Sequence, residues 1–583
     1  MNATARPAYE WKDLPWPVIE RHVFKLQTRI FQASGRGDVR TVHRLQRLLT
    51  HSWSAKCLAV RRVTQDNRGK KTAGVDGVKA LRPLQRLCLV ATLSLTKKAR
   101  PLRRVWIPKP HGAEQRPLGI PVLHDRAAQA LAKLGLEPEW EAKFEPNSYG
   151  FRPGRSCHDA IKAIRDVIKN QDRWVLDADI RQCFDRISHQ ALLAKLHTYA
   201  ELQRSIRGWL KAGVLDAGVF STTAVGTPQG GVVSPLLANI ALHGMETHLQ
   251  QRCPARTGRH DYRSAVKLIR YADDLVVLHT DRAAVEAAQQ VLGEWLAGMG
   301  LELKPEKTRL THTRHGDEPG FNFLGFTVRQ FPRGKHRTAH SAKGQALGFG
   351  TMVTPSKEAC KAHQRKLKDV IRRARAATQV ALIGELNPII RGWTRYYSTA
   401  NSSQVFAKQN DLTQRKLVRW AQHRHAGASR TSLYRRYWSK GWRFTARADG
   451  QQLTLVLHTD TRLNRHVKVQ GTRSPYDGDW LYWGTRMGRH PELSAQVARL
   501  LKRQQGKCAA CGLHLKVGDL VENDHLVPRS QHGSGQDENR QLLHRHCHDT
   551  KSAHDRGQAT EEPDAGKLAR PVLKTGGRGD PVA

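Results

Sequence analysis

Aspartates stand in two short segments whose flanking residues favour β-strands. Asp179 follows the strand-forming run Trp174–Ala178, and Asp273 and Asp274 lie together between two apolar runs. The second pattern predicts a β-hairpin with both carboxylates at its turn. Nucleotidyl transfer uses two Mg²⁺ ions about 3.5–4 Å apart, and carboxylate oxygens are the preferred ligands of such hard cations. Because an isolated Asp-Asp pair is usually a solvated turn, this chemistry depends on the motifs around it.

A second group of residues, near the C-terminus, has the spacing of a metal site. Cys508 and Cys511 form a Cys-x-x-Cys pair, and His544 and Cys547 follow as a second half-site. Two such halves can hold Zn²⁺ tetrahedrally, with His546 as the alternative to His544. A unit this small has little core, so a bound metal would supply the missing stability. The other interpretation, a redox Cys-x-x-Cys, lacks a surrounding βαβ pattern.

The elements that must position these residues belong to a strongly basic chain of 583 residues. Lys and Arg number 97 against 51 Asp and Glu, which gives a formal net charge of +46 and a pI of about 10.5. Such a charge indicates a polyanionic partner, because each phosphate that Lys or Arg neutralises releases condensed counterions. Long nucleic acid is the expected partner, and a merely basic enzyme is the alternative.

Cysteine usage and hydropathy indicate the compartment. Six of the nine cysteines are scattered along the chain, which favours a reducing environment. No apolar run approaches the roughly 20 residues that span a bilayer, and residues 1–16 lack the apolar region of a secretory signal. We expect no membrane association and a cytoplasmic location, either the bacterial cytoplasm and nucleoid or the interior of an organelle.

Hydrophobic periodicity divides the chain into regions. Residues 18–63 carry apolar side chains at helical spacing, and residues 106–328 alternate apolar strands with helices. Residues 353–442 are basic and helical, and residues 443–490 are expected to be strand-like and aromatic. The tail, residues 557–583, is rich in Gly, Pro and charge and is predicted to be disordered.

Several motifs in this order and spacing resemble those of reverse transcriptases. Tyr271-Ala-Asp-Asp274 resembles their metal-binding hairpin, and Asp179–His189 resembles their first metal-binding strand. Between them, Gly226–Asn239 resembles the Pro-Gln-Gly loop and its following helix. The remaining matches are the fingers motifs, Ile107–Pro121 and Ser148–Arg155, and the closing palm motifs, Gly300–Thr308 and Phe323–Phe326.

Further segments narrow the resemblance to one group. Residues 36–79 resemble the N-terminal extension of group II intron proteins, and Leu386–Tyr397 resembles their maturase, or X, segment. Val521–Pro528, followed by Asn539 and His548, resembles the HNH nuclease motif. The chain is therefore similar to group II intron-encoded reverse transcriptase/maturase proteins with a C-terminal HNH endonuclease domain.

The resemblance implies a multidomain α/β and α fold. We expect a right-hand polymerase, with fingers, a palm with an antiparallel sheet and a helical thumb, plus a small zinc-stapled ββα-metal (HNH) domain. The expected domains are an RNA-binding N-terminal extension (1–80), fingers and palm (81–345), thumb/maturase (346–440), a DNA-binding region (441–505), the HNH endonuclease (506–556) and the tail (557–583).

The resemblance also implies roles at the polymerase site. Asp179 and Asp273 would bind both Mg²⁺ ions, with Asp274 assisting and the carbonyl of Ile180 facing a metal. The ring of Phe184 would be the steric gate that excludes a ribose 2′-hydroxyl. The other expected dNTP contacts are Lys109 and Arg116 on the triphosphate, Gln229 in the nucleotide pocket, and Lys307 near the pyrophosphate leaving group. For Lys307, a surface role is nearly as well supported.

At the HNH motif, Asp524 and His548 would hold one Mg²⁺ or Mn²⁺ ion. His525 would be the general base, because an unperturbed imidazole pKa near about 6.5 suits proton abstraction from water. Asn539 would orient the loop that carries His525. The alternative is a zinc finger that only binds DNA.

These assignments imply a multifunctional protein. It would be an RNA-directed DNA polymerase, a maturase for its own intron RNA, and an endonuclease that nicks the second strand during intron homing. Its partners would be the intron RNA, as a lariat ribonucleoprotein, target DNA and dNTPs, and a homodimer is compatible with this function. A nonmobile maturase and a host-domesticated or defence-associated reverse transcriptase are the alternatives.

Overall fold

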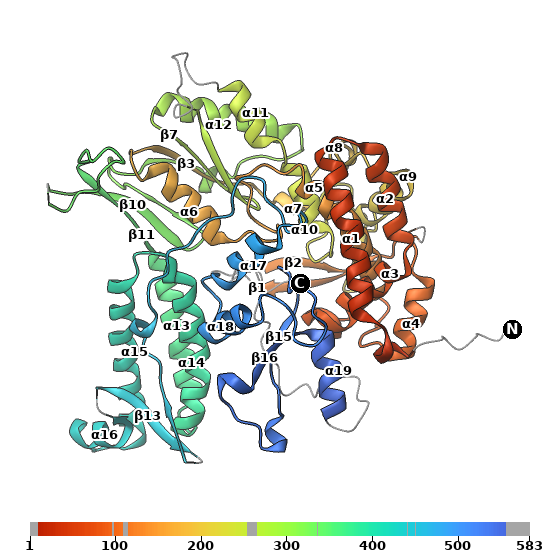
Figure 1. Ribbon diagram of the computed structural model, residues 1–583. Coiled ribbons are helices and arrows are strands. Elements are labelled where there is room, and N and C mark those ends of the chain that lie inside the picture. The colour runs from red at the N-terminus through yellow and green to blue at the C-terminus, as the bar shows by residue number, and fades with distance from the viewer. Residues whose placement is uncertain are drawn as a thin grey trace.

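The computed structural model describes residues 10–95, 98–108, 115–253, 265–334, 336–439, 441–448 and 450–555. Two expectations concern residues outside these ranges: the triphosphate contact of Lys109 and the disorder of residues 557–583. Within them, helices and four larger sheets pack around several hydrophobic clusters (Figure 1).

Three helices at the N-terminus confirm the helical pattern predicted for residues 18–63. They are α1 (Trp16–Gly35), α2 (Val39–His51) and α3 (Trp53–Arg61). On α1, Ile19, Val23, Leu26 and Ile30 recur at helical spacing, and all four are buried. These helices pack on α5 (Leu123–Glu141), and α4 (Pro83–Thr92) packs beside α3, at the right of Figure 1.

A mixed sheet follows, with the strand order β2-β1-β4-β5. Its strands are β1 (Leu102–Pro108), β2 (Gln115–Ile120), β4 (Val214–Asp216) and β5 (Val219–Ser221). Strand β1 pairs antiparallel with β2 and parallel with β4.

The second sheet has the order β6-β7-β3-β8, and every pairing in it is antiparallel. Its strands are β3 (Trp174–Asp179), β6 (Lys267–Tyr271), β7 (Asp274–His279) and β8 (Arg309–His312). In each of the two central strands, two consecutive residues are fully buried: Val175 and Leu176 in β3, and Val276 and Val277 in β7. Both faces of the sheet are therefore covered, and α6 (Cys157–Ile168) and α12 (Arg282–Ala297) contact it.

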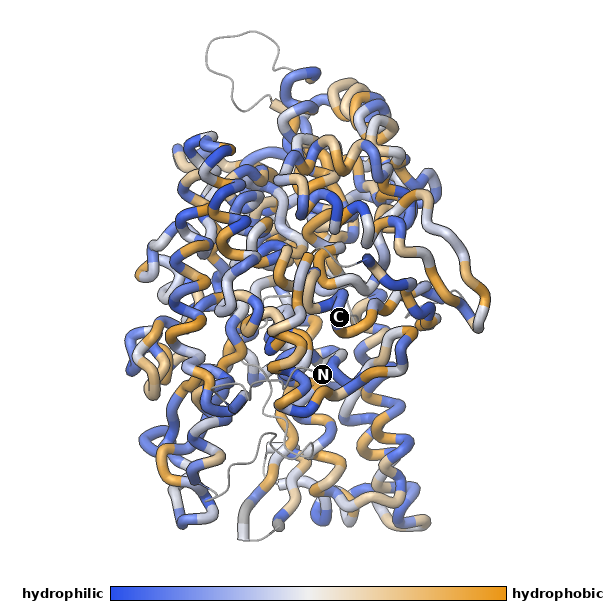
Figure 2. Tube along the Cα trace, turned by 90° about the vertical axis from the view of Figure 1, so that its right-hand side faces the viewer, coloured by the Kyte–Doolittle hydropathy of each residue, from blue (hydrophilic) through white to orange (hydrophobic). Residues whose placement is uncertain are grey.

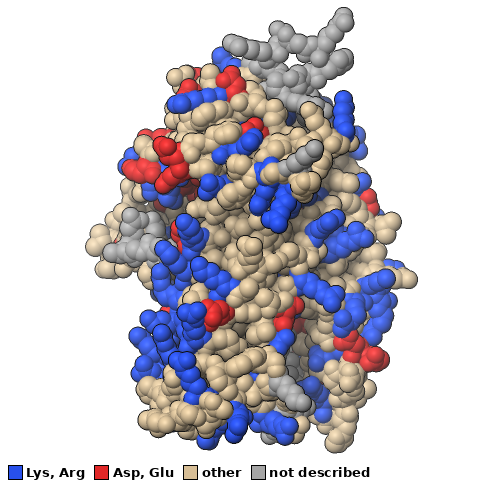
Figure 3. Space-filling model, turned by 90° about the vertical axis from the view of Figure 1, so that its left-hand side faces the viewer, with Lys and Arg blue, Asp and Glu red and all other residues tan. Residues whose placement is uncertain are grey.

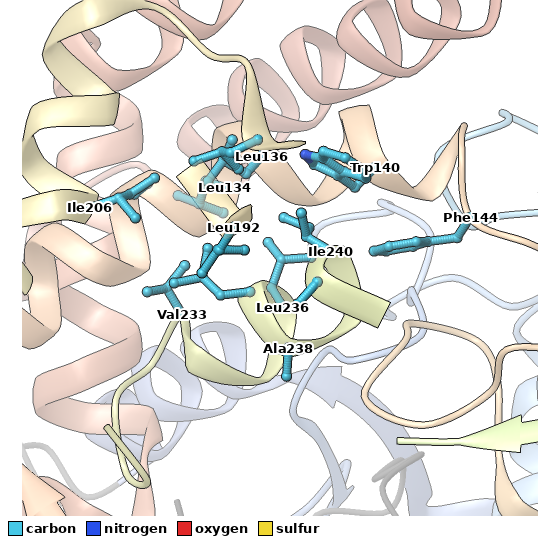
Figure 4. Packing of buried hydrophobic residues seen from close by; sticks show 14 of the residues in the cluster. Leu134, Leu136, Trp140, Phe144, Leu192, Ile206, Val233, Leu236, Ala238 and Ile240 are labelled. Carbon is cyan, nitrogen blue, oxygen red and sulfur yellow. The ribbon is translucent and has the colours of Figure 1, made fainter. Parts of the chain in front are cut away.

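Helix α10 (Ser234–Leu242) is buried almost all round, which agrees with its largely apolar sequence. In Figure 4 its residues Leu236 and Ile240 face Leu134 and Trp140 of α5 and Leu192 of α8. The surrounding helices are α7 (Cys183–Arg186), α8 (His189–Leu196), α9 (Ala200–Leu210) and α11 (Met245–Arg252). This core fixes α10 and the loop before it.

A third sheet leads into a basic helical region at the lower left of Figure 1. The sheet consists of β9 (Phe321–Phe323), β10 (Phe326–Pro332) and β11 (Phe349–Pro355). The helices are α13 (Lys357–Arg373), α14 (Gln379–Tyr396), α15 (Ser403–Arg424) and α16 (Arg430–Tyr437), followed by the strands β12 (Trp438–Ser439), β13 (Arg443–Ala448) and β14 (Gln451–Thr454). Lys and Arg gather over this face of the molecule (Figure 3).

The expectation of strand-like structure throughout residues 443–490 is wrong beyond β14. Residues Trp480–Gly488 form helix α17. Asp479 caps the helix by accepting a hydrogen bond from the backbone N–H of Tyr482, and Trp483 and Met487, four residues apart, are buried on one face. Cap and spacing outweigh the strand propensity of the aromatic residues.

The C-terminal unit has a ββα arrangement. It comprises β15 (Val521–His525), β16 (Arg540–His544) and α19 (Arg545–Asp555). Its hydrophobic cluster also takes in Val497, Leu500 and Leu501 of α18 (Ala495–Arg503). The core of this unit therefore begins upstream of the expected boundary at residue 506.

Hydropathy along the helices bears on whether any of them could cross a membrane. Among the described residues, no helix is both long enough and apolar enough to cross a membrane. Apolar residues run through the interior of the trace and alternate with polar ones along the outer helices (Figure 2).

The packing of Gly150 against the β6–β7 turn gives a first prediction. A Cβ at Gly150 would overlap the backbone nitrogen of Ala272, whereas a Cβ at Gly35 would meet nothing within 4 Å. Gly150→Ala should therefore cost about 1–3 kcal/mol through overpacking and lower the thermal midpoint of the full chain. Gly35→Ala is the matched control and should leave the midpoint unchanged or slightly raised. Equal midpoints for the two variants would contradict this packing.

Candidate active sites

The first candidate site lies where β3 ends and β7 begins. Asp179, the last residue of β3, stands directly opposite Asp274, the first residue of β7. Asp273 occupies the turn between β6 and β7, as the hairpin prediction required. The preceding turn residue, Ala272, has a φ of 56°, which suits a tight hairpin turn. The register thus brings three carboxylates to one edge of the sheet.

These carboxylates lie close enough to repel one another. Burial, with repulsion from Asp273 and Asp179, raises the pKa of Asp274 to about 8. The Lys307 ammonium lies 2.6 Å from Asp179 Oδ2, and this hydrogen bond raises the pKa of Lys307. A donor set of three neighbouring carboxylates, one of them disfavoured as an anion, fits divalent cations.

A buried arginine, which was not among the residues expected at this site, holds the hairpin turn. The fully buried guanidinium of Arg270 donates hydrogen bonds to the carbonyl of Ala272 (2.9 Å), to Asn239 Oδ1 (3.1 Å) and to Ser148 Oγ (2.7 Å). Asn239 Nδ2 in turn donates to the carbonyl of Gly150 (2.8 Å). The sequence signal for this role is weak: an arginine between the apolar residue Ile269 and Tyr271 in strand β6.

The loop before α10 is fixed beside Phe184 and Asp185 of α7. The N–H of Thr227 donates to the carbonyl of Phe184 (2.5 Å), and Gln229 Nε2 donates to Asp185 Oδ2 (2.9 Å). Gly226 has a φ of +88°, and a Cβ there would come within 2.6 Å of the Asp185 carbonyl. These hydrogen bonds therefore hold the loop that carries Gln229 against the segment that carries Phe184.

Other predicted residues are placed by the backbone. Arg116 lies on β2 opposite Ile107, and its strand is tied to the same loop because the N–H of Gly119 donates to the carbonyl of Gln229 (2.7 Å). Ile180 directly follows Asp179. It is buried and forms an isolated antiparallel β-bridge with Leu303.

The second candidate site gathers the predicted cysteines and histidine. The ligand atoms of Cys508, Cys511, His544 and Cys547 all lie within 4.8 Å of one another. His544 Nδ1 is 3.4 Å from Cys511 Sγ, and its Nε2 is 3.4 Å from Asp519. Sequence reasoning missed Asp519.

The competing histidine, His546, has a different environment. Its Nδ1 lies 3.2 Å from Glu20 of α1, although the ring also contacts Cys511. No sequence pattern could have linked Glu20 to this site, because the contact joins the two ends of the chain.

The third candidate site lies at the end of β15. Asp524 Oδ1 is 3.8 Å from His548 Nε2 of α19, and the Lys551 ammonium is 3.3 Å from Asp524 Oδ2. An acidic oxygen and an imidazole nitrogen at this separation can share a divalent cation.

The loop after His525 is closed by Asn539. Its Oδ1 accepts from the N–H of Val527 (2.8 Å), and its Nδ2 donates to the carbonyls of Val527 (3.0 Å) and Ser534 (2.6 Å). Burial, together with Arg540 and Arg529, lowers the pKa of His525. A neutral imidazole at neutral pH can accept a proton.

The C-terminal unit also packs on the N-terminal helices. Arg61 of α3 lies 3.1 Å from Asp549 of α19, and the Lys516 ammonium stands 4.2 Å from the ring centroid of Phe24 on α1. Asp549 directly follows His548, so this interface reaches the third site.

Comparisons with known proteins agree with this arrangement of sites. Four family models match in order: the N-terminal domain of reverse transcriptase (residues 11–93), reverse transcriptase (RNA-dependent DNA polymerase) (107–328), the group II intron maturase-specific domain (360–438) and HNH endonuclease (508–554).

Relatives extend the match. Protein YkfC of Escherichia coli (strain K12) is 35% identical over 49% of this chain and 82% of its own length. The group II intron-encoded protein LtrA of Lactococcus lactis subsp. cremoris is 27% identical over 52% of this chain and 61% of its own length. Maturase-like protein 1 of Euglena gracilis is 25% identical over 66% of this chain and 77% of its own length.

The fold and sites thus define a polymerase joined to a nuclease. More particularly, the chain belongs to the group II intron-encoded reverse transcriptase/maturase family with a C-terminal HNH endonuclease domain. It is a multifunctional group II intron protein, an RNA-directed DNA polymerase and an HNH endonuclease.

Proposed function

We propose that the chain promotes splicing of its own intron RNA and then acts with the excised lariat in intron homing. The RNA would reverse-splice into one strand of a DNA target, the HNH unit would nick the other strand, and the polymerase site would copy the intron from that 3′ end. The observation that carries the proposal is the placement of Asp273 and Asp274 opposite Asp179, in a chain that also holds Asp524 beside His548. A nonmobile maturase would not need either set.

A right-hand layout accounts for the order of elements. The extension (1–80) corresponds to α1–α3, and the palm to the sheet β6-β7-β3-β8 within residues 81–345. Helices α13–α16 would be the thumb (346–440). Residues 441–505 would contact DNA, with the HNH unit following. The Lys and Arg side chains on the face in Figure 3 can contact phosphates, which supports RNA and DNA as the partners.

At the polymerase site, Asp179, Asp273 and Asp274 would hold two Mg²⁺ ions, with the Ile180 carbonyl as a further ligand. When bound, the ions activate the primer 3′-hydroxyl and neutralise the triphosphate. Phe184 would stack under the sugar and exclude a 2′-hydroxyl, and Gln229 would line the pocket, its amide held by Asp185. Arg116 and Lys109 would grip the triphosphate, and Lys307 would move from Asp179 toward the leaving group.

The four donors Cys508, Cys511, His544 and Cys547 fit a structural Zn²⁺. A carboxylate on the far nitrogen of a ligating histidine is typical of zinc sites, and Asp519 stands there for His544. His546 is instead held by Glu20, which favours His544 as the ligand.

At the nuclease centre, Asp524 and His548 would hold one Mg²⁺ or Mn²⁺ ion that polarises the scissile phosphate. His525 would take the proton from the attacking water, and Asn539 would hold the loop that orients it.

The palm assignment predicts the effect of Asp273→Asn. Losing one carboxylate should lower cDNA synthesis on an RNA template by about 10²–10³-fold, because several kcal/mol of metal-dependent stabilisation disappear. Intron RNA binding and splicing, assayed in parallel, should stay within a few-fold. Full cDNA synthesis by this variant would remove Asp273 from the metal site.

The nuclease assignments predict that chemistry and scaffold can be separated. His525→Ala should lower second-strand nicking by about 10²–10⁴-fold, the usual contribution of a general base. Zinc content, reverse transcription and splicing should not change. Cys508→Ser should also stop nicking, but it should lose zinc and make residues 506–556 sensitive to protease, because the small core cannot offset chain entropy without its metal.

The measurements are metal analysis, limited proteolysis and strand-specific nicking by the ribonucleoprotein. His544→Ala and His546→Ala form a matched pair, and only the first should lose zinc. Normal nicking by His525→Ala would refute the HNH assignment. Zinc retained by Cys508→Ser or by His544→Ala would refute the ligand set.

A further inference from the structure

An exposed aromatic residue next to the polymerase site has an unfavourable backbone conformation. Phe151 has a φ of 57°, in the left-handed region, and its side chain is 36% exposed. For a bulky residue this conformation costs about 1–3 kcal/mol, whereas Gly or Asn would adopt it readily. Burial cannot explain the choice of Phe, so the ring needs another role.

The neighbours of Phe151 hold its backbone in place. The Gly150 carbonyl accepts a hydrogen bond from Asn239 of α10, and Gly150 packs against the backbone of Ala272 in the catalytic turn. On the other side, Arg152 is buried and pairs with both carboxylate oxygens of Glu141 (2.9 and 3.0 Å). The turn therefore cannot relax without breaking contacts with the hairpin and the helical core.

The strained turn places the Phe151 ring against Phe184. The ring centroids are 6.0 Å apart and the ring planes meet at 77°, which is the edge-to-face geometry that aromatic pairs favour. Phe184 is partly buried, and its side chain also packs against the large hydrophobic cluster that contains α10. The hydrogen bond from the Thr227 N–H to the Phe184 carbonyl fixes the backbone. Among the described residues, Phe151 supplies the aromatic ring that contacts the Phe184 ring edge to face.

We propose that Phe151 is a positioning residue for sugar selection: its ring holds Phe184 in the orientation that excludes a ribose 2′-hydroxyl. The inference rests on the proposed gate role of Phe184 and extends it to a second residue. The shared turn also couples the gate to the metal-binding hairpin, because Gly150 contacts Ala272 while Phe151 contacts Phe184.

The test compares dNTP and rNTP incorporation by the full chain in single-nucleotide primer extension on an RNA template. The readout is the ratio of kcat/KM for a dNTP to that for the matching rNTP. Phe151→Gly removes the ring and relieves the backbone strain, so its folding is not at risk from the φ angle. Phe151→Tyr keeps the ring. His197→Gly is the matched control, because His197 is also exposed and left-handed (φ 37°) and its ring centroid lies 6.0 Å from that of His43, but it stands between α8 and α9.

Phe184→Ala should lower the selectivity ratio most. Phe151→Gly should lower it by about two- to tenfold, the range that one aromatic pair allows, with dNTP kcat/KM within a few-fold of the parent. Phe151→Tyr and His197→Gly should keep the parental ratio. The double variant Phe151→Gly/Phe184→Ala should be no less selective than Phe184→Ala, because Phe151 acts through the ring already removed.

Two failures are distinguishable. If Phe184→Ala lowers selectivity and Phe151→Gly does not, or if the two effects multiply, the positioning role of Phe151 is wrong and the gate stands. If Phe184→Ala leaves selectivity unchanged, the gate assignment itself is wrong and the role of Phe151 falls with it.

Discussion

The polymerase site depends on the hydrogen bonds that the buried guanidinium of Arg270 donates. It joins three segments that are distant in the chain: the turn at Ser148, the helix residue Asn239 and the hairpin carbonyl of Ala272. Burial lowers the pKa of Arg270 to about 10, so the group is still a cation at neutral pH. Each acceptor left without its donor in this interior would cost about 1–3 kcal/mol. The position of Asp273, one residue after Ala272, follows from this clamp.

The same region concentrates negative charge at the sheet edge. Asp179, Asp273 and Asp274 meet there, and the Lys307 ammonium compensates Asp179 in part. Such a convergence of carboxylate oxygens suits divalent cations, and the rigid hairpin keeps the carboxylates from separating. The nuclease end uses another constraint: contacts of Glu20 and Arg61 with His546 and Asp549 tie the last helix to the first ones. The N-terminal helices and the HNH unit thus form one structural block.

Local patterns predicted much of this. The Asp-Asp hairpin, the helices of residues 18–63 and the Cys-x-x-Cys half-site depend on residues close in sequence, so their spacing alone indicates them. Contacts between distant segments could not be predicted: Arg270 with Ser148, Asp519 with His544, and Glu20 with His546 have no local signature. Helix α17 was missed because aromatic residues suggested a strand, although the Asp479 cap lies directly before it. The strain at Phe151 is invisible in a sequence because only the folded turn imposes its φ.

We propose that the three carboxylates at the edge of the β6-β7-β3-β8 sheet hold two divalent ions. Electron paramagnetic resonance can count the bound Mn²⁺ ions. The sample is the full chain with Asp524→Ala, which removes the nuclease ligand, bound to an RNA template, a dideoxy-terminated primer and the matching dNTP. We expect two more tightly bound Mn²⁺ ions in this complex than in the same complex that also carries Asp179→Ala. An equal number of bound ions in the two complexes would contradict it.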